Sequence, residues 1–215
     1  MVRRHPHSAR EYLSYIRTID PRRLWFFDEF HIVGSNVWKR KVRRNPFTGE
    51  YPSLPTDSSF RTRFNVMSAS GLCPQNGHSP AQFSLSEDNG DTYGYVKFMV
   101  DRVKAGVFAP GSVAVMDNAS IHKGATGKKL EDWLWNYVLP DGQPLRMLVV
   151  FLPTRFFELN PQELVIGFVS KKCNNYSLIG APMDGSIVPL FAQRAFAECS
   201  VDHILAFFRK CGYAR

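Results

Sequence analysis

The chain has 215 residues, enough for one substantial core, and its 44% hydrophobic and 21% charged residues are typical of a globular domain. No apolar run approaches the roughly 20 residues of a membrane-spanning helix, and the basic start at residues 1–7 lacks the apolar stretch of a secretory signal, which argues against a membrane protein or a secreted one. The formal net charge is +8, and residues 1–50 hold eleven Lys and Arg against five Asp and Glu. We therefore expect a polyanionic partner, with nucleic acid favoured over an anionic membrane surface. The alternative is a basic surface that is only solvated.

The cysteines are widely scattered along the chain. They are Cys73, Cys173, Cys199 and Cys211, and no two of them form a Cys-x-x-Cys pair. A zinc knuckle needs closely spaced thiols, so this spacing argues against one. We expect reduced thiols in an intracellular protein.

The first third of the chain predicts one helix followed by three strands. Residues 8–19 have apolar residues at helical spacing behind Ser8, which can serve as the N-terminal cap. Apolar residues dominate 24–33, which we interpret as a buried strand, and strands are also predicted over the strongly basic 36–44 and over 62–70. Because short or loop connections join these strands, we expect them to pair antiparallel.

Helices and strands alternate in the rest of the chain. After a turn-rich stretch around residues 74–80, the periodicity predicts helices over 91–104, 126–138 and about 161–172, strands over 112–117 and 145–152, and one or two more helices between 188 and 210. Three antiparallel strands followed by alternating helices and strands predict an α/β fold, with a mixed five-stranded sheet and helices on both of its faces. We expect a single domain over residues 1–215.

Three acidic residues occupy positions where a sheet protein can build a site. Asp28 lies midway along the first predicted strand, Asp117 ends the fourth, and Glu163 lies in the first turn of the helix that begins at Pro161. Open sheets often place their sites at such strand ends. Clustered carboxylates repel one another unless a cation neutralises them, and hard divalent cations prefer oxygen ligands. Two such ions can activate a water or a hydroxyl and stabilise the leaving oxygen at a phosphodiester.

Each acid also has an interpretation that involves no chemistry. Asp117–Asn118 suits an Asx turn at the end of a strand. Asn160 and Glu163 suit a capping box, in which Asn160 caps the helix and Glu163 reaches back to it. Asp28 has the weakest structural alternative, because an acid in an apolar strand is costly to bury unless it is paired or bound to a metal.

Three sequence blocks carry a resemblance to a known family. Phe26–Glu29 ends in an Asp-Glu pair, Val115–His122 contains Asp-Asn-Ala-x-x-His, and Leu152–Pro153 is followed by Glu-Leu-Asn-Pro-Gln-Glu at Glu158–Glu163. In this order the blocks resemble those of the DDE transposases of the Tc/mariner superfamily and of the related bacterial insertion-sequence enzymes. The resemblance runs from about residue 10 to the C-terminus, where Phe207–Tyr213 is similar to the end of some eukaryotic members.

The resemblance implies an RNase H-like fold with a catalytic triad of Asp28, Asp117 and Glu163. In that family the triad binds two Mg²⁺ or Mn²⁺ ions, so Asp28 and Asp117 would share metal ligation and Glu163 would complete the second site. The family nicks DNA at transposon ends by attack of water, and the freed 3′-hydroxyl then attacks target DNA. The implied partner is therefore double-stranded DNA, and the implied location is the nucleus of a eukaryotic host or otherwise the cytoplasm.

Basic residues indicate where the DNA backbone would be held. On a strand only alternate residues share a face, so about half of the charges in Lys39–Arg44, namely Lys39, Lys41 and Arg43, can hold phosphates together. His122 is a candidate contact to the scissile phosphate or to a metal-bound water, with a surface or capping role as the alternative. Whether two copies form a homodimer is left open.

The chain also departs from the family pattern near the third acid. Leu152–Phe157 replaces the usual Pro-Pro-Tyr-Ser-Pro-like run, and Gln162 replaces an apolar residue. Catalysis tolerates little misplacement, so these changes bear on how the acid is positioned. The helical wheel still places Glu163 away from the apolar stripe of Leu164 and Phe168.

Three functions follow from these observations. The leading one is a DNA endonuclease and strand-transfer domain that uses two divalent metal ions. The helix-turn-helix modules that read transposon ends in this family are expected to be absent, because the chain starts almost at the catalytic domain. The first alternative is therefore a catalytically inactive or host-adopted DNA-binding protein derived from a transposase. The second is an RNase H-like nuclease of another family, which would cleave without strand transfer.

Overall fold

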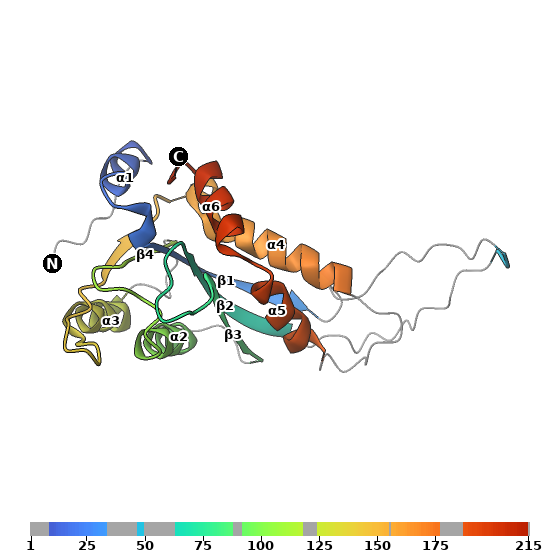
Figure 1. Cartoon of the computed structure of the whole chain (residues 1–215), viewed down its shortest axis with the longest axis horizontal. Coiled ribbons are helices and arrows are strands. Elements are labelled where there is room, and N and C mark those ends of the chain that lie inside the picture. The colour runs from blue at the N-terminus through green and yellow to red at the C-terminus, as the bar shows by residue number, and fades with distance from the viewer. Residues whose placement is uncertain are drawn as a thin grey trace.

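Figure 1 shows the computed structural model of the chain, in which residues 9–33, 47–49, 63–87, 92–117, 124–154, 156–176 and 187–214 are described. Its centre is a five-stranded sheet with the order β3-β2-β1-β4-β5. The strands are β1 (Leu24–Val33), β2 (Arg63–Gly71), β3 (Ala81–Ser86), β4 (Val113–Met116) and β5 (Leu148–Phe151). The helices are α1 (Ala9–Ile16), α2 (Thr92–Lys104), α3 (Gly124–Asn136), α4 (Pro161–Tyr176), α5 (Val188–Ala197) and α6 (Val201–Lys210), with 3₁₀ turns at η1 (Pro21–Arg23) and η4 (Phe157–Leu159).

The strand pairing makes the sheet mixed. β2 pairs antiparallel with β1 and with β3, whereas β4 pairs parallel with β1 and with β5. A short turn region joins β2 to β3, as antiparallel neighbours allow, and α3 supplies the crossover that the parallel neighbours β4 and β5 require. The predicted mixed α/β sheet is confirmed.

One antiparallel strand differs from the prediction. The strand predicted over 36–44 lies outside the described residues. The third antiparallel strand of the described sheet is β3, which follows the turn-rich residues 74–80 and for which the sequence analysis predicts no strand. The β3 sequence, Ala-Gln-Phe-Ser-Leu-Ser, alternates apolar and polar residues at the period of a half-buried strand. Helix ends also move, since α4 extends to Tyr176 rather than 172 and α1 ends at Ile16 rather than 19.

Helices cover both faces of the sheet and enclose two hydrophobic cores (Figure 1). Helices α4, α5 and α6 cover one face, where Phe26 is fully buried, and α2 and α3 cover the other, where Trp25 and Phe27 are buried. Burying each such aromatic side chain contributes about 1.5–3 kcal/mol, so a one-residue slip of β1 would be strongly unfavourable. Strand alternation then puts Asp28 on the same face as Phe26, toward α4.

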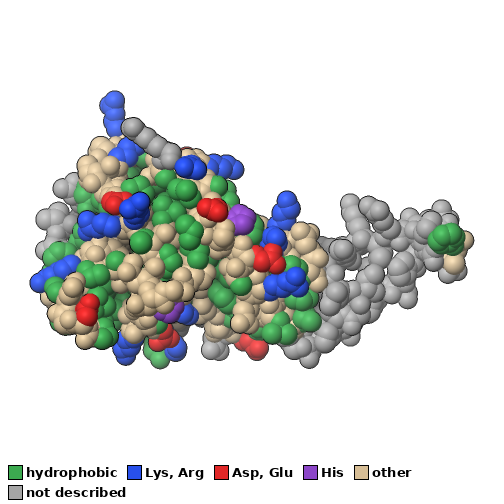
Figure 2. All heavy atoms as spheres, in the orientation of Figure 1, with side chains coloured by type: hydrophobic (Ala, Val, Ile, Leu, Met, Phe, Trp, Pro, Cys, Tyr) green, Lys and Arg blue, Asp and Glu red, His purple; other side chains and the backbone are tan. Residues whose placement is uncertain are grey.

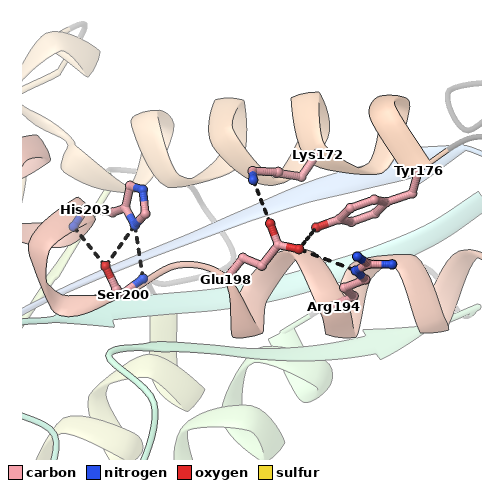
Figure 3. Close-up of polar contacts among 6 residues, drawn as sticks. All are labelled: Lys172, Tyr176, Arg194, Glu198, Ser200 and His203. Carbon is pink, nitrogen blue, oxygen red and sulfur yellow. Dashed lines mark hydrogen bonds and ion pairs between the residues drawn. The ribbon is translucent and has the colours of Figure 1, made fainter.

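The far end of α4 is tied to α5 by a polar cluster around Glu198 (Figure 3). One carboxylate oxygen of Glu198 accepts from Lys172 Nζ at 2.6 Å, and the other accepts from the hydroxyl of Tyr176. The bond from Lys172, followed by the bond from Tyr176, lowers the pKa of Glu198 to about 2. Just beyond, Ser200 and His203 form the capping box that begins α6. The bonds to Glu198 thus join the C-terminal part of α4 to the end of α5.

The chain segment before α4 is tied to the C-terminal residues. The hydroxyl of Tyr213 donates to the backbone carbonyl of Leu159 at 2.5 Å and lies 2.8 Å from the hydroxyl of Tyr12. Because Tyr213 uses its proton on Leu159, Tyr12 donates to Tyr213. The Tyr213 ring also packs on Phe26, with 4.7 Å between ring centroids. Helix α1, the C-terminal residues and the start of α4 are thereby joined.

Three of the four cysteine side chains are buried. Cys73, Cys173, Cys199 and Cys211 are all free thiols. Burial raises the pKa of the three thiols that lie in the core, to about 11 for Cys173 and about 12 for Cys199. Within the described residues, no helix has the length and apolar character needed to cross a membrane.

Candidate active site

Asp28 and Asp117 meet at the end of the parallel pair β1–β4. The pairing runs from Leu24↔Val113 to Phe27↔Met116, so the two acids are the next residues on neighbouring chain segments. Beyond this point β1 continues beside β2, where Asp28 is opposite Ser68. The acids therefore lie at the carboxyl edge of the parallel pair, which is where open sheets place their sites.

The half-buried carboxylate of Asp28 is held by two hydrogen bonds. Its Oδ1 accepts from the backbone amide of Glu29 at 2.9 Å, and its Oδ2 accepts from Asn160 Nδ2 at 2.7 Å. Asn160 is buried, and its own side-chain oxygen accepts from the backbone amide of Gln162 at 3.1 Å. The amide of Asn160 thus connects the first acid to the first turn of α4.

The pKa of Asp28 is raised by burial and by the charges of the other predicted acids. Burial raises the pKa of Asp28 to about 7, and the neighbouring carboxylate of Glu163 adds to the rise. The amide hydrogen bond from Glu29 opposes it, while the charges of Asp117 and Glu29 add smaller increases. The charges of both other predicted triad members therefore act on Asp28. A bound cation would relieve the repulsion among the three carboxylates.

Glu163 is exposed on the first turn of α4. The fully buried stripe of this helix is Val165, Val169 and Cys173, whereas the predicted Leu164 and Phe168 are only partly buried beside it. The capping interpretation requires a backbone amide at Asn160 for Glu163 to bind, and that amide donates to Phe157 at 2.9 Å instead. The side chain of Asn160 satisfies the Gln162 amide, so the carboxylate of Glu163 is left at the surface within electrostatic range of Asp28.

A buried polar network beneath the acids was not predicted from the sequence. Gln162 Nε2 donates to Ser68 Oγ at 2.7 Å, and Gln162 Oε1 accepts from Ser70 Oγ at 2.5 Å. Ser68 Oγ in turn donates to the backbone carbonyl of Asp28 at 3.1 Å. The available signal was the pair of serines on the strand face that also carries the apolar Phe64 and Val66, together with a glutamine where the resembled signature has an apolar residue.

The donor chemistry of the acids fits a hard divalent cation, because all of the ligands would be carboxylate oxygens. In the described part of the chain, however, no group of three or more His, Cys, Asp and Glu is arranged so that it could hold a metal ion. In the described residues Glu163 and Asp117 thus lie near enough to Asp28 to raise its pKa, but the three acids do not form a closed ligand shell. Their assignment as metal ligands stays a prediction.

The predicted DNA contacts Lys39, Lys41, Arg43 and His122 lie outside the described residues, so they also stay predictions. Figure 2 shows Lys and Arg side chains spread over the visible face with acidic side chains between them. On that face the described residues form no single basic patch. The net charge of +8 is therefore the feature that still favours a polyanionic partner.

Comparison with protein families gives one match that covers most of the chain. A family model described as "DDE superfamily endonuclease" matches residues 23–180, a range that contains Asp28, Asp117 and Glu163. Comparison with curated proteins gives no match.

Solved structures of a mariner transposase share the fold. The catalytic domain of Mos1 mariner transposase superposes with a TM-score of 0.59 at 12% identity, covering 98% of this chain and 92% of that one. The pre-cleavage Mos1 transpososome gives a TM-score of 0.61 at 12% identity, covering 93% of this chain and 55% of that one. The Mos1 paired-end complex with Mg gives 0.62 at 13% identity, with 98% and 61% covered. The chain thus spans little more than half of the longer Mos1 chains, and the similarity confirms the predicted RNase H-like fold.

Proposed function

Because the chain belongs to the DDE superfamily of endonucleases, we propose that it cuts DNA and joins it by strand transfer, using two divalent metal ions held by Asp28, Asp117 and Glu163. One observation carries the proposal, namely the 2.7 Å hydrogen bond from Asn160 to Asp28. That bond connects the first acid to the helix turn that bears the third, across 132 positions of sequence. A structural acid would not need a neighbouring Glu163 that raises its pKa.

In this chemistry the protein would position the charged carboxylates. Mg²⁺ or Mn²⁺ would supply an activated water or hydroxyl and stabilise the leaving oxygen of a phosphodiester. Asn160 and the amide of Glu29 each hold one oxygen of Asp28, which fixes the plane of that carboxylate. Glu163 is exposed, so a DNA backbone can approach it without rearrangement of α4.

The proposed substrate is double-stranded DNA, first at transposon ends and then at a target. The structural relatives include Mos1 paired-end complexes, one of them with a left transposon end. In this chain, Lys39, Lys41 and Arg43 would hold backbone phosphates without reading sequence, and His122 would lie near the scissile phosphate. Nuclear location in a eukaryotic host belongs to the same proposal.

Nicking of supercoiled plasmid tests the proposal directly. We expect the purified chain to convert supercoiled plasmid to open circles only with Mg²⁺ or Mn²⁺. The Glu163→Gln variant should lose this activity, whereas Glu158→Gln, an exposed glutamate of the same sequence block, should keep it. Equal nicking by wild type and Glu163→Gln would overturn the assignment of Glu163.

A second candidate is a DNA-binding protein that keeps the fold and no longer cuts. It is favoured by the lack of a closed metal-ligand group among the described residues. This candidate predicts plasmid binding that weakens as salt rises, with no metal-dependent nicking. The same plasmid assay, run beside a gel-shift measurement, distinguishes the two functions.

A further inference from the structure

The side chain of Gln162 is fully buried between α4 and β2, and its hydrogen bonds are directional. Its Nε2 donates to Ser68, 1% exposed, and its Oε1 accepts from Ser70, 0% exposed. A buried amide without hydrogen-bond partners destabilises a protein by roughly 1–3 kcal/mol. The hydrogen bonds to the two serines offset this cost. An apolar side chain would fill the same space but could not form hydrogen bonds to the two serines of β2.

The proton arrangement also fixes which end of the amide faces which serine. Ser68 has one hydroxyl proton, and it donates this proton to the backbone carbonyl of Asp28 at 3.1 Å. Ser68 must therefore accept from Gln162, which requires Nε2 rather than Oε1 on that side. Oε1 then faces Ser70, which donates to it. The orientation of the amide follows from the network as a whole.

Gln162 reaches Asp28 by two routes. The side chain reaches the carbonyl of Asp28 through Ser68. The backbone amide reaches the carboxylate of Asp28 through Asn160, at 3.1 Å and then 2.7 Å. The four residues form a closed ring that joins β1, β2 and the first turn of α4. Glu163 is the next residue after Gln162, so the ring constrains where its carboxylate lies relative to Asp28.

We propose that Gln162 is a positioning residue that sets the separation of Asp28 and Glu163 through the Ser68 and Ser70 hydrogen bonds, and so tunes divalent metal affinity. This inference rests on the proposed metal-binding function of the acids. Residues that orient metal ligands commonly change metal affinity by about 10–100-fold when they are altered. Gln162 itself would contact neither metal nor DNA.

The test separates positioning from stability. Gln162→Met keeps the side-chain volume but leaves both serine hydroxyls without their amide partner, so it should lower Tm. The double variant Gln162→Met/Ser70→Ala removes one of these stranded hydroxyls and should recover part of that Tm. Mn²⁺ affinity, measured by electron paramagnetic resonance of the free ion, should stay about tenfold or more below wild type in both variants. Val169→Ala, which opens a cavity two turns along α4, should lower Tm without changing Mn²⁺ affinity.

The outcomes are distinct for the two proposals. If wild type binds Mn²⁺, Asp28→Asn loses it, and the double variant binds as wild type does, the positioning role is wrong while the metal site stands. If wild type and Asp28→Asn bind Mn²⁺ equally, the metal site itself is wrong. Ser70→Ala alone is the milder variant should the others not fold, and wild-type affinity in Ser70→Ala would also overturn the positioning role.

Discussion

Asp28 lies in an apolar strand, and the protein offsets only part of the cost of its charge. Two hydrogen bonds stabilise the carboxylate, but burial and the charges of Glu163, Asp117 and Glu29 raise its pKa to about 7. A structural acid is normally paired with a base, whereas the two groups described above as donating to the Asp28 carboxylate are amides. The remaining repulsion is what a divalent cation would remove.

The raised pKa predicts a pH-dependent gain in stability for Asp28→Asn in metal-free protein. The folded state binds the proton more tightly than the unfolded state, so protonated Asp28 contributes stability that is present below pH 3.8 and is lost as pH rises to about 7. The advantage of Asn should therefore grow over this range and level off above it, at on the order of 2–4 kcal/mol. Urea unfolding at pH 4.5, 6 and 8 in the presence of a chelator measures it.

The matched control is Asp132→Asn, which changes an exposed aspartate on α3. Its free energy of unfolding should stay within about 0.5 kcal/mol of wild type, as is usual for an exposed surface substitution. A pH-independent effect of Asp28→Asn would mean that Asp28 is ionised in the folded state through stronger interactions than those described.

At the scale of elements, the first turn of α4 is fixed from three sides. Hydrogen bonds reach it from β1 through Asn160, from β2 through Gln162, and from the C-terminal residues through Tyr213, which binds Leu159 just before the helix. The run that precedes the third acid departs from the resembled family, and these bonds hold the chain segment that follows it. The place of the first turn of α4 on the sheet is thus defined by tertiary contacts, whereas its starting residue follows from local sequence.

Replacing Tyr213 by Phe should destabilise the protein by about 1–3 kcal/mol, because the carbonyl of Leu159 and the hydroxyl of Tyr12 both lose their partner. The ring packing on Phe26 is kept, so the change reports on the hydrogen bonds. Urea unfolding of Tyr213→Phe, Tyr12→Phe and the double variant measures it. The double variant should lose less than the sum of the single variants, whereas strict additivity would contradict the described bond between the two tyrosines.

At the scale of the whole molecule, strong hydrophobic periodicity made most elements predictable. β1 and α2 were predicted within one residue because each has a clear buried pattern, such as Tyr95, Phe98, Met99 and Val103 on α2. β3 was missed because its alternation covers only residues 81–86 directly behind turn-forming prolines. The order of antiparallel and parallel strands followed from connection type, which is why the sheet class could be predicted.

The candidate site was only partly predictable. The strand-end position of Asp117 and the helix-start position of Glu163 follow from local pattern. Strand pairing places Asp28 beside Asp117, and the Asn160 hydrogen bond connects Asp28 to the turn that bears Glu163. The role of Gln162 could not be seen, because its partners Ser70 and Ser68 lie 92 and 94 positions away and only the register of β2 brings them together. Motifs therefore locate the acids, and tertiary hydrogen bonds determine how they are held.

Binding of divalent metal by the three acids can be tested without knowledge of the DNA ends, by a calorimetric titration with Mn²⁺. We predict two bound ions per chain for wild type, loss of at least one in Asp28→Asn and in Glu163→Gln, and wild-type binding in the Glu158→Gln control. Absence of binding to wild type, or equal binding by all four proteins, would show that the three acids do not form a metal site.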